Sequence, residues 1–256
     1  MSSELVRHRC VNGISHVVLN RPERHNALVP ELLTALRAAL QDAAAAAPAV
    51  LVLSANGRSF STGGDVRAFF EVTGAARRAY AATVVGLLNQ VIVDLLRFPS
   101  PSIAAVHGLV TGGSLGLVLG CDMAVAAPPA RFAPWYADVG FSPDGGWTAL
   151  LPERIGRARA LEIQLLNRTI TAEEALSYGL VQQLVEQAEL MPRIEALAAA
   201  IAGKKAGSIA RTLSLMRPNA AAVAAALEAE YRSFLEQIVT AEAQAGMAEF
   251  LGRPVG

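Results

Sequence analysis

One stretch limits the possible folds of this chain more than any other. From Phe98 to Cys121 it contains no Asp, Glu, Lys or Arg, and it holds five glycines. A run of about twenty apolar residues is long enough to span a bilayer. However, Pro99 and Pro101 interrupt its start, the glycines weaken it as a helix, and the rest of the chain is amphipathic. We therefore expect a buried strand, a tight turn and a buried helix, and no association with a membrane.

The composition indicates a globular chain without a charge field that would attract polyanions. Its 256 residues are 53% hydrophobic, which is enough for a sizeable core. The 22 basic and 22 acidic residues are interspersed, so nucleic acid is not an expected partner. Cys10 and Cys121 are too few for a disulfide framework, and the charged start MSSELVRHRC lacks the apolar stretch of a signal peptide. The expected location is the cytoplasm.

Strand patterns alternate with helical patterns through the first half of the chain, which is typical of an α/β fold with a mostly parallel sheet. We expect strands at 4–10, 14–20, 49–54, 102–107 and 123–127, and helices at 30–47, 75–97 and 113–120. After Gly145 the expected helices are 145–155, 158–166, 171–178, 188–203, 206–216 and 220–250, with one strand-like segment at 179–185. The sequence thus predicts an α/β core over 1–200 and a helical C-terminal segment over 201–256.

The glycine run does not match a nucleotide loop, because neither GxxxxGK[ST] nor GxGxxG occurs in it. It does match the Gly-x-Ser-x-Gly elbow of serine hydrolases at residues 112–116. Enzymes with that elbow take their histidine base from downstream of the serine, whereas every histidine here precedes Ser114: His8, His16, His25 and His107. We expect Ser114 to be a small residue at a helix start, with a serine hydrolase as an alternative.

A second glycine site, NGRSFSTGGDVRAFF at 56–70, also follows a strand and precedes a helical pattern. Two such turns can aim backbone N–H groups at one point, which makes an oxyanion hole. Glycine suits this task because a ligand oxygen must approach the main chain closely. We expect Asp65, in contrast, to be a helix N-cap.

The motifs together resemble the enoyl-CoA hydratase/isomerase, or crotonase, superfamily. The resemblance rests on NRPERHNAL (20–28), SFSTGGDVRAF (59–69), AAVHGLVTGGSLGLVLGCDMAVA (104–126), VGFSPDGGWTALLPERIGRARALEI (139–163) and ITAEEALSYGLVQQLV (170–185). It implies a crotonase-like spiral of β-β-α units, a C-terminal segment that forms homotrimers or homohexamers, and oxyanion-hole amides at Gly64 and Gly113. It implies an acyl-CoA thioester as substrate, with coenzyme A as part of the substrate and no further cofactor or metal.

The resemblance also implies where acyl-CoA binds. Pantetheine is expected near TGGDV (62–66) and LVTGG (109–113), and the nucleotide end near RPERHNAL, where Arg24 and His25 are candidates for the phosphates. The alternative for these two is a solvated loop. The implied substrate-binding residues are Arg24, His25, Ala27, Thr62, Gly63, Asp65, Val66, Leu109, Gly112 and Tyr136.

The acid or base is the remaining question. Hydratases of this superfamily use two glutamates, and the corresponding positions here are Gly116 and Tyr136, so water addition is not expected. Asp144, in FSPDGG, matches the position of the catalytic aspartate of the isomerases. An Asx turn or helix N-cap is its alternative role. Asp138 and Asp122 are weaker candidates, and we expect Asp122 to be structural.

The same aspartate is the nucleophile of aroyl-CoA dehalogenases, but this chain has Asn89 in place of their histidine base and Tyr136 in place of their stacking tryptophan. Trp135 is expected to point elsewhere. We therefore predict an enoyl-CoA isomerase of fatty acid metabolism. The alternatives are a hydratase-type lyase, a dehalogenase-like enzyme and an acyl-CoA binder without activity. Six apolar side chains could line the pocket, although the core is expected for most: Phe69, Phe70, Leu87, Leu88, Trp135 and Phe141.

Overall fold

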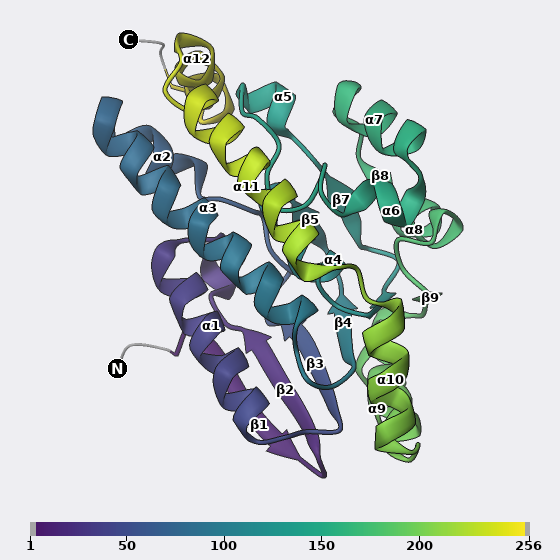
Figure 1. The fold of residues 1–256 in the computed structure, drawn as a ribbon. Helices are drawn as coiled ribbons and strands as arrows, with labels where there is room; N and C mark the ends of the chain where they lie inside the picture. The colour runs from purple at the N-terminus through teal and green to yellow at the C-terminus, as the bar shows by residue number, and fades with distance from the viewer. Residues whose placement is uncertain (1–3, 254–256) are drawn as a thin grey trace.

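The computed structural model describes residues 4–253 and contains a six-stranded and a three-stranded sheet surrounded by helices (Figure 1). In the larger sheet the strand order is β1-β2-β3-β4-β6-β9. Its first two strands form an antiparallel hairpin and the others pair in parallel, as expected. Asn12 and Gly13 both have positive φ, which fits the turn of a two-residue hairpin. The strands are β1 Val6–Val11, β2 Ile14–Leu19, β3 Val50–Ala55, β4 Ser102–Val106, β6 Met123–Ala126 and β9 Gln183–Leu184.

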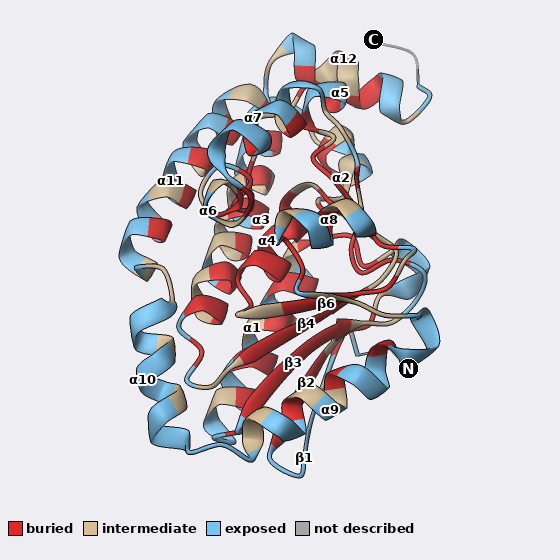
Figure 2. Ribbon diagram, turned by 90° about the vertical axis from the view of Figure 1, so that its right-hand side faces the viewer, coloured by how far each residue is buried: buried red, intermediate tan, exposed pale blue. Residues whose placement is uncertain are grey.

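Helices cover both faces of this sheet, which explains why its central strands are apolar on both sides. On one face α1 (Pro30–Ala45) packs against β1 and β2, and α3 (Gly74–Leu96) lies between α1 and α11 (Ala220–Gln237) (Figure 1). On the other face α9 (Leu190–Ala202) packs against the strands, and Figure 2 shows the buried sheet between these layers. The two cores alternate along β3, since Leu51 and Leu53 belong to the first and Val50 and Val52 to the second.

Within residues 4–253, α3 is the one helix that is long and apolar enough to cross a membrane. The glycine run, which we considered for that role in the sequence, forms β4, β5 and a short helix instead. Val85, Leu88 and Ile92 of α3 are buried in the larger core. Its place between two other helices is therefore that of an interior helix of the fold.

The sequence patterns did not predict the smaller sheet, whose strand β5 is part of the glycine run. Its strands are very short: β5 Leu109–Thr111, β7 Arg131–Ala133 and β8 Ile170–Thr171, in the order β5-β7-β8. Strand β5 leads directly into the 3-10 helix η2 (Gly112–Ser114) and α4 (Leu115–Leu119). The expected sequence of strand, turn and buried helix is thus confirmed.

Three expectations about the second half of the chain were wrong in detail. The segment 145–150 is a turn, because Gly145 and Gly146 adopt φ of 62° and 88°, and helix α6 begins only at Leu151. The expected helix 220–250 is two helices, since Thr240 caps α12 by accepting a hydrogen bond from the Ala243 N–H. The strand-like segment 179–185 reduces to β9. The other helices are α2 Val66–Glu71, α5 Tyr136–Val139, α6 Leu151–Ile155, α7 Arg157–Leu165, α8 Ala172–Tyr178, α10 Ala206–Met216 and α12 Ala241–Phe250.

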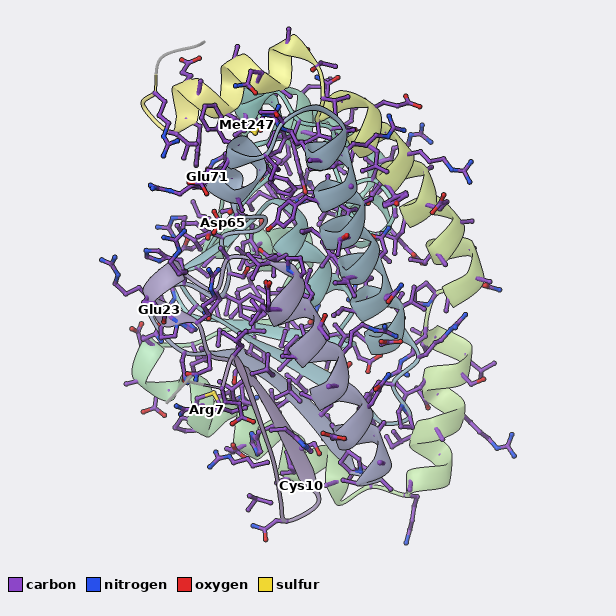
Figure 3. The ribbon with its side chains drawn as sticks, turned by 90° about the vertical axis from the view of Figure 1, so that its left-hand side faces the viewer. Arg7, Cys10, Glu23, Asp65, Glu71 and Met247 are labelled. Atoms are coloured by element: carbon purple, nitrogen blue, oxygen red, sulfur yellow. The ribbon has the colours of Figure 1, made fainter. Side chains whose placement is uncertain are left out.

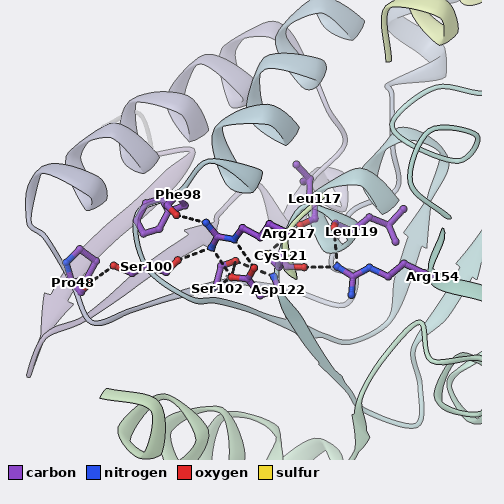
Figure 4. A network of polar contacts seen from close by, with 10 residues as sticks. All are labelled: Pro48, Phe98, Ser100, Ser102, Leu117, Leu119, Cys121, Asp122, Arg154 and Arg217. Atoms are coloured by element: carbon purple, nitrogen blue, oxygen red, sulfur yellow. Dashed lines mark hydrogen bonds and ion pairs between the residues drawn. The ribbon is translucent and has the colours of Figure 1, made fainter. Parts of the chain in front are cut away.

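Asp122 has the structural role expected of it (Figure 4). Its carboxylate accepts hydrogen bonds from the backbone N–H and the hydroxyl of Ser102, at 2.8 and 3.0 Å. Arg217, between α10 and α11, donates to the same carboxylate at 2.7 Å through two nitrogens. This network ties the C-terminal helices to the start of β4.

Candidate active site

A cavity of about 370 Å³ lies where the two glycine turns meet α5, α11 and α12. Eleven of the residues implied for the site line it: Arg24, His25, Ala27, Thr62, Gly64, Asp65, Val66, Gly112, Gly113, Tyr136 and Asp144. Gly63 and Leu109 lie outside the lining. The structure therefore brings together segments that are more than one hundred residues apart in the sequence.

Gly63 and Leu109 instead join the two turns. The Ser61 N–H donates to the Leu109 carbonyl at 3.0 Å, and the Thr111 N–H donates to the Ser61 carbonyl at 3.1 Å. Gly63 has a φ of 71°, and a Cβ added there would lie 2.4 Å from the Thr111 carbonyl oxygen. Only glycine permits this approach of the two backbones.

Gly64 and Gly113 both line the cavity. Gly113 is the second residue of η2, so its N–H lies in the first turn, where no acceptor exists inside the helix. Within residues 4–253, the Gly64 N–H also has no hydrogen-bond acceptor. A Cβ at Gly64 would lie 2.8 Å from Phe69 Cε2, and one at Gly113 would lie 2.6 Å from Leu88 Cδ2. Two free donors in a confined space are what an oxyanion hole requires.

Asp144 is buried beside Gly113. A Cβ added to Gly113 would lie 2.9 Å from Asp144 Oδ1, which shows how closely the carboxyl group approaches that turn. The Tyr136 hydroxyl donates to Oδ1 at 2.5 Å. Burial raises the pKa of Asp144 to about 7, the Tyr136 hydrogen bond opposes this, and the nearby charge of Glu230 adds to it. This carboxyl group can therefore take up and release a proton near neutral pH.

The loop that carries Asp144 is fixed by Glu230, a buried residue of α11. Its carboxylate accepts hydrogen bonds from the N–H groups of Gly146, Thr148 and Ala149 at 2.8, 2.8 and 2.9 Å. Burial raises the pKa of Glu230. Sequence reasoning missed this residue, although a signal was present: Glu230 occupies the apolar stripe of α11, three residues after Leu227 and four before Phe234.

Trp147 connects the same loop to the oxyanion turn. Its indole Nε1 donates to the Gly112 carbonyl at 2.8 Å, and its ring is fully buried. Gly145 packs directly on Gly113, where an added Cβ would lie 2.4 Å from the Gly113 Cα. The loop and the turn thus form one rigid unit around Asp144.

The charged residues that line the cavity beside Thr62 and Val66 are Glu23, Arg24, Asp65 and Arg67, and Figure 3 shows Glu23 and Asp65 along one side of the molecule. Asp65 caps α2, as expected, by accepting a hydrogen bond from the Ala68 N–H at 3.3 Å. Arg24 pairs with Asp65 at 3.2 Å while 45% of its side chain is exposed. His25 Nδ1 lies 3.1 Å from the Ser59 hydroxyl. Arg24 and His25 are therefore partly ordered by their neighbours rather than fully solvated.

The apolar wall is more extensive than expected. Phe69, Leu88 and Phe141 line the cavity, whereas Phe70 and Leu87 do not. Trp135 also lines it, and its φ of 55° turns the chain at this residue. The sequence missed the contributions of the C-terminal helices, Phe234, Phe250 and Leu251. The rings of Phe141 and Phe234 meet edge to face at 5.4 Å.

Two alternative residues are not placed for catalysis. Ser114 is fully buried, lies outside the cavity lining, and donates its hydroxyl to the carbonyls of Ser61 and Thr111 at 2.9 and 2.8 Å. A serine nucleophile needs access and a neighbouring base, so the structure contradicts the serine hydrolase alternative. Asn89 lies outside the cavity and donates to the Leu227 carbonyl at 3.1 Å. Among residues 4–253, no group of three or more His, Cys, Asp or Glu side chains is placed to hold a metal ion.

Two glycine turns that face one cavity, in a fold of strand and helix units, are the features of the crotonase superfamily. The chain belongs to the enoyl-CoA hydratase/isomerase family, whose model matches residues 9–254. It is 38% identical over 195 residues to the probable enoyl-CoA hydratase EchA12 of Mycobacterium tuberculosis, across 74% of this chain and 68% of that protein. It is 31% identical over 183 residues to the trans-2-decenoyl-[acyl-carrier-protein] isomerase of Streptococcus mutans, across 70% of this chain and 68% of that protein.

A crystal structure of an enoyl-CoA hydratase from Bacillus halodurans superimposes with a TM-score of 0.90 at 25% identity, across 96% of this chain and 99% of that one. The predicted family and fold are therefore confirmed, and the chain is an acyl-CoA enzyme of this superfamily. The names of its relatives include both a hydratase and an isomerase. The reaction has to be argued from the site.

Proposed function

We propose that this protein shifts the double bond of an enoyl-CoA thioester. The Asp144 carboxylate removes a proton from C2 of a 3-enoyl thioester, and the electron pair moves into a dienolate. The N–H groups of Gly64 and Gly113 stabilise the oxyanion of that dienolate. Asp144 then returns the proton to C4, and the 2-enoyl thioester forms with no net gain or loss of atoms.

One observation carries this proposal: among the carboxylates that line the cavity, Asp144 is the buried one, and it lies against Gly113. Asp65 also lines the cavity, but it caps α2 and pairs with Arg24. A pKa of about 7 gives Asp144 substantial populations of both protonation states near neutral pH. A group that must act first as base and then as acid needs such a balance.

The site supports hydration and dehalogenation less well. Gly116 and Tyr136 take the positions of the two hydratase glutamates, and neither provides a carboxylate. Asn89 takes the position of the dehalogenase histidine, and it lies outside the cavity. Hydrolysis of an aspartyl ester would therefore lack that base.

The wider expectations belong to the same proposal. Coenzyme A enters as part of the substrate, with no additional cofactor, and Arg24 and His25 are the candidates for its phosphates. The other partners follow the family resemblance: further copies of this chain in a homotrimer or homohexamer built with the C-terminal segment. We further propose a cytoplasmic role in fatty acid metabolism, without nucleic acid or membrane partners.

The test is a panel of 2-enoyl, 3-enoyl and aroyl thioesters of CoA, followed for double-bond shift, water addition and release of halide or thiol. We expect the double-bond shift to dominate, and Asp144→Asn to lower its turnover by about 10²- to 10⁴-fold while acyl-CoA binding persists. Rapid water addition to a 2-enoyl thioester by the unchanged protein would contradict the proposal and show that the protein is a hydratase. If the protein turned over none of these thioesters, we would conclude that it binds acyl-CoA without catalysis.

A further inference from the structure

The Tyr136 hydroxyl forms hydrogen bonds with Asp144. It lies 2.5 Å from Asp144 Oδ1 and 3.0 Å from the carbonyl oxygen of the same residue. The shorter distance is in the range of an O–H donor that bonds a carboxylate. The Tyr136 ring is buried and meets the fully buried Trp147 ring edge to face at 6.4 Å. Because its surroundings are packed, the phenol has little freedom to leave this position.

The second carboxylate oxygen is in a different situation. Among the residues that the structure describes, no group of another residue donates a hydrogen bond to Oδ2 of Asp144, and the one further donor to this carboxyl group is the backbone N–H of Asp144 itself. A Cβ built on Gly113 would lie 3.2 Å from Oδ2, so this oxygen also faces the oxyanion turn. One oxygen is thus fixed by Tyr136, and the other is free at the place where the thioester would be activated.

We propose that Tyr136 is a positioning residue, which holds Oδ1 so that Oδ2 alone removes the C2 proton and returns it to C4. This inference rests on the proposed function. It changes the role of Tyr136 from substrate contact to orientation of the base. If Oδ1 were free, the carboxylate could rotate and exchange its oxygens between the two proton transfers. Fixing Oδ1 keeps the proton on one face of the dienolate.

The same hydrogen bond affects the charge of the base. Burial raises the pKa of Asp144, Glu230 of α11 raises it further, and the hydroxyl of Tyr136 in α5 lowers it. The backbone N–H of Asp144 also lowers this pKa, and the other group shown beside the carboxyl oxygens, Gly113 of η2, has no side chain. Removing the hydroxyl therefore has one predicted direction: the pKa of Asp144 rises, and the acid limb of the rate profile moves to higher pH.

The test compares Tyr136→Phe with the unchanged protein in double-bond shift as a function of pH. We expect turnover to fall by about 10- to 100-fold and the acid limb of kcat/KM to move up by about one to two pH units, the range for a hydrogen bond to a charged group. Tyr80→Phe is the matched control, because it removes a hydroxyl from a ring that packs on Phe69 at 5.3 Å but does not line the cavity. Its rate profile should stay unchanged.

A second variant distinguishes the effect of the hydrogen bond from the effect of misfolding. Replacing Tyr136 with 3-fluorotyrosine keeps the ring and makes the phenol a stronger donor, so the acid limb should move to lower pH. Opposite shifts in the two variants support the proposal. A fall in turnover with an unmoved acid limb in both variants, or an unchanged rate in Tyr136→Phe, overturns it.

Failure of the proposed function would be recognised separately. Infrared titration, with Asp144→Asn as the reference spectrum, follows the carboxyl group without any substrate. The protein could turn over no thioester while the pKa of Asp144 still shifts in opposite directions in the two variants. In that case the hydrogen bond between Tyr136 and Asp144 is confirmed, and the proposed double-bond shift is wrong. If the titration does not shift, the positioning role is wrong whatever the reaction.

Discussion

Asp144→Asn is expected to stabilise the folded protein above pH 7 while it removes the proposed base. The wild-type carboxyl group is buried with a pKa near 7, compared with an ordinary value of 3.8. The folded state therefore holds this proton over a pH range in which the unfolded state has released it. Asparagine does not titrate, and it keeps an oxygen that can accept the Tyr136 hydrogen bond.

The sign and size of the effect follow from linkage. Because the folded state binds the proton more tightly, wild-type stability falls as pH rises from about 4 to about 7. At about 1.4 kcal/mol per pH unit, the full loss is about 4 kcal/mol, and at pH 5 about 1 to 2 kcal/mol of it has occurred. The advantage of Asp144→Asn should therefore grow between pH 5 and pH 8 and stay constant above that.

Urea unfolding followed by circular dichroism at pH 5 and pH 8, at one protein concentration, measures this difference. Asp138→Asn is the matched control, since Asp138 is an exposed carboxylate of the neighbouring helix α5. Asp138→Asn should change the free energy of unfolding only slightly at both pH 5 and pH 8. If Asp144→Asn destabilises the protein at pH 8, or changes stability equally at both pH values, the buried carboxyl group is not held protonated by its surroundings.

Three further outcomes test other parts of the site. Gly113→Pro removes the proposed donor and should lower turnover about 10²- to 10³-fold with CoA binding retained. Gly113→Ala keeps the donor and measures the cost of bulk alone, because its Cβ would meet Leu88 Cδ2 at 2.6 Å and Asp144 Oδ1 at 2.9 Å. Equal losses in the proline and alanine variants would make Gly113 a packing residue. Ser114→Ala should keep thioester turnover, and a fluorophosphonate probe should not label the unchanged protein. Phe250→Ala should raise KM for longer acyl chains more than for short ones; equal KM values would place Phe250 outside the acyl pocket.

The sequence predicted the parts of the site that depend on local backbone geometry. The two glycine-rich turns are visible in the sequence, although the family resemblance was needed to single out Gly64 and Gly113 within them, and a capping aspartate such as Asp65 precedes its helix directly. The family resemblance added Asp144, whose local sequence alone also fits a turn. Strands β3, β4 and β6 were predictable because helices bury them on both faces and their apolar runs are continuous.

The parts that the sequence did not reveal depend on distant contacts. Strands β5, β7 and β8 are too short to show a period, and they are ordered by pairing with one another. Phe234 and Phe250 reach the cavity only because α11 and α12 fold back over it. Glu230 gave a signal as a charge in an apolar stripe, but its partners lie more than eighty residues earlier. Such residues acquire their roles from tertiary structure.

The missing hydratase glutamate and the presence of Asp144 have a common structural cause. A Cβ at Gly116 would lie 2.4 Å from Ile92 Cδ1 and 2.5 Å from the carbonyl oxygen of Gly145. The second contact is with the backbone of the loop that follows Asp144, so it cannot be relieved by a change of rotamer. A glutamate at this position and the present path of the loop exclude each other. Gly116 therefore does more than lack a carboxylate: it provides the space in which the loop packs on α4 and holds Asp144 against Gly113. This packing supports the proposed double-bond shift, in which one carboxylate transfers the proton.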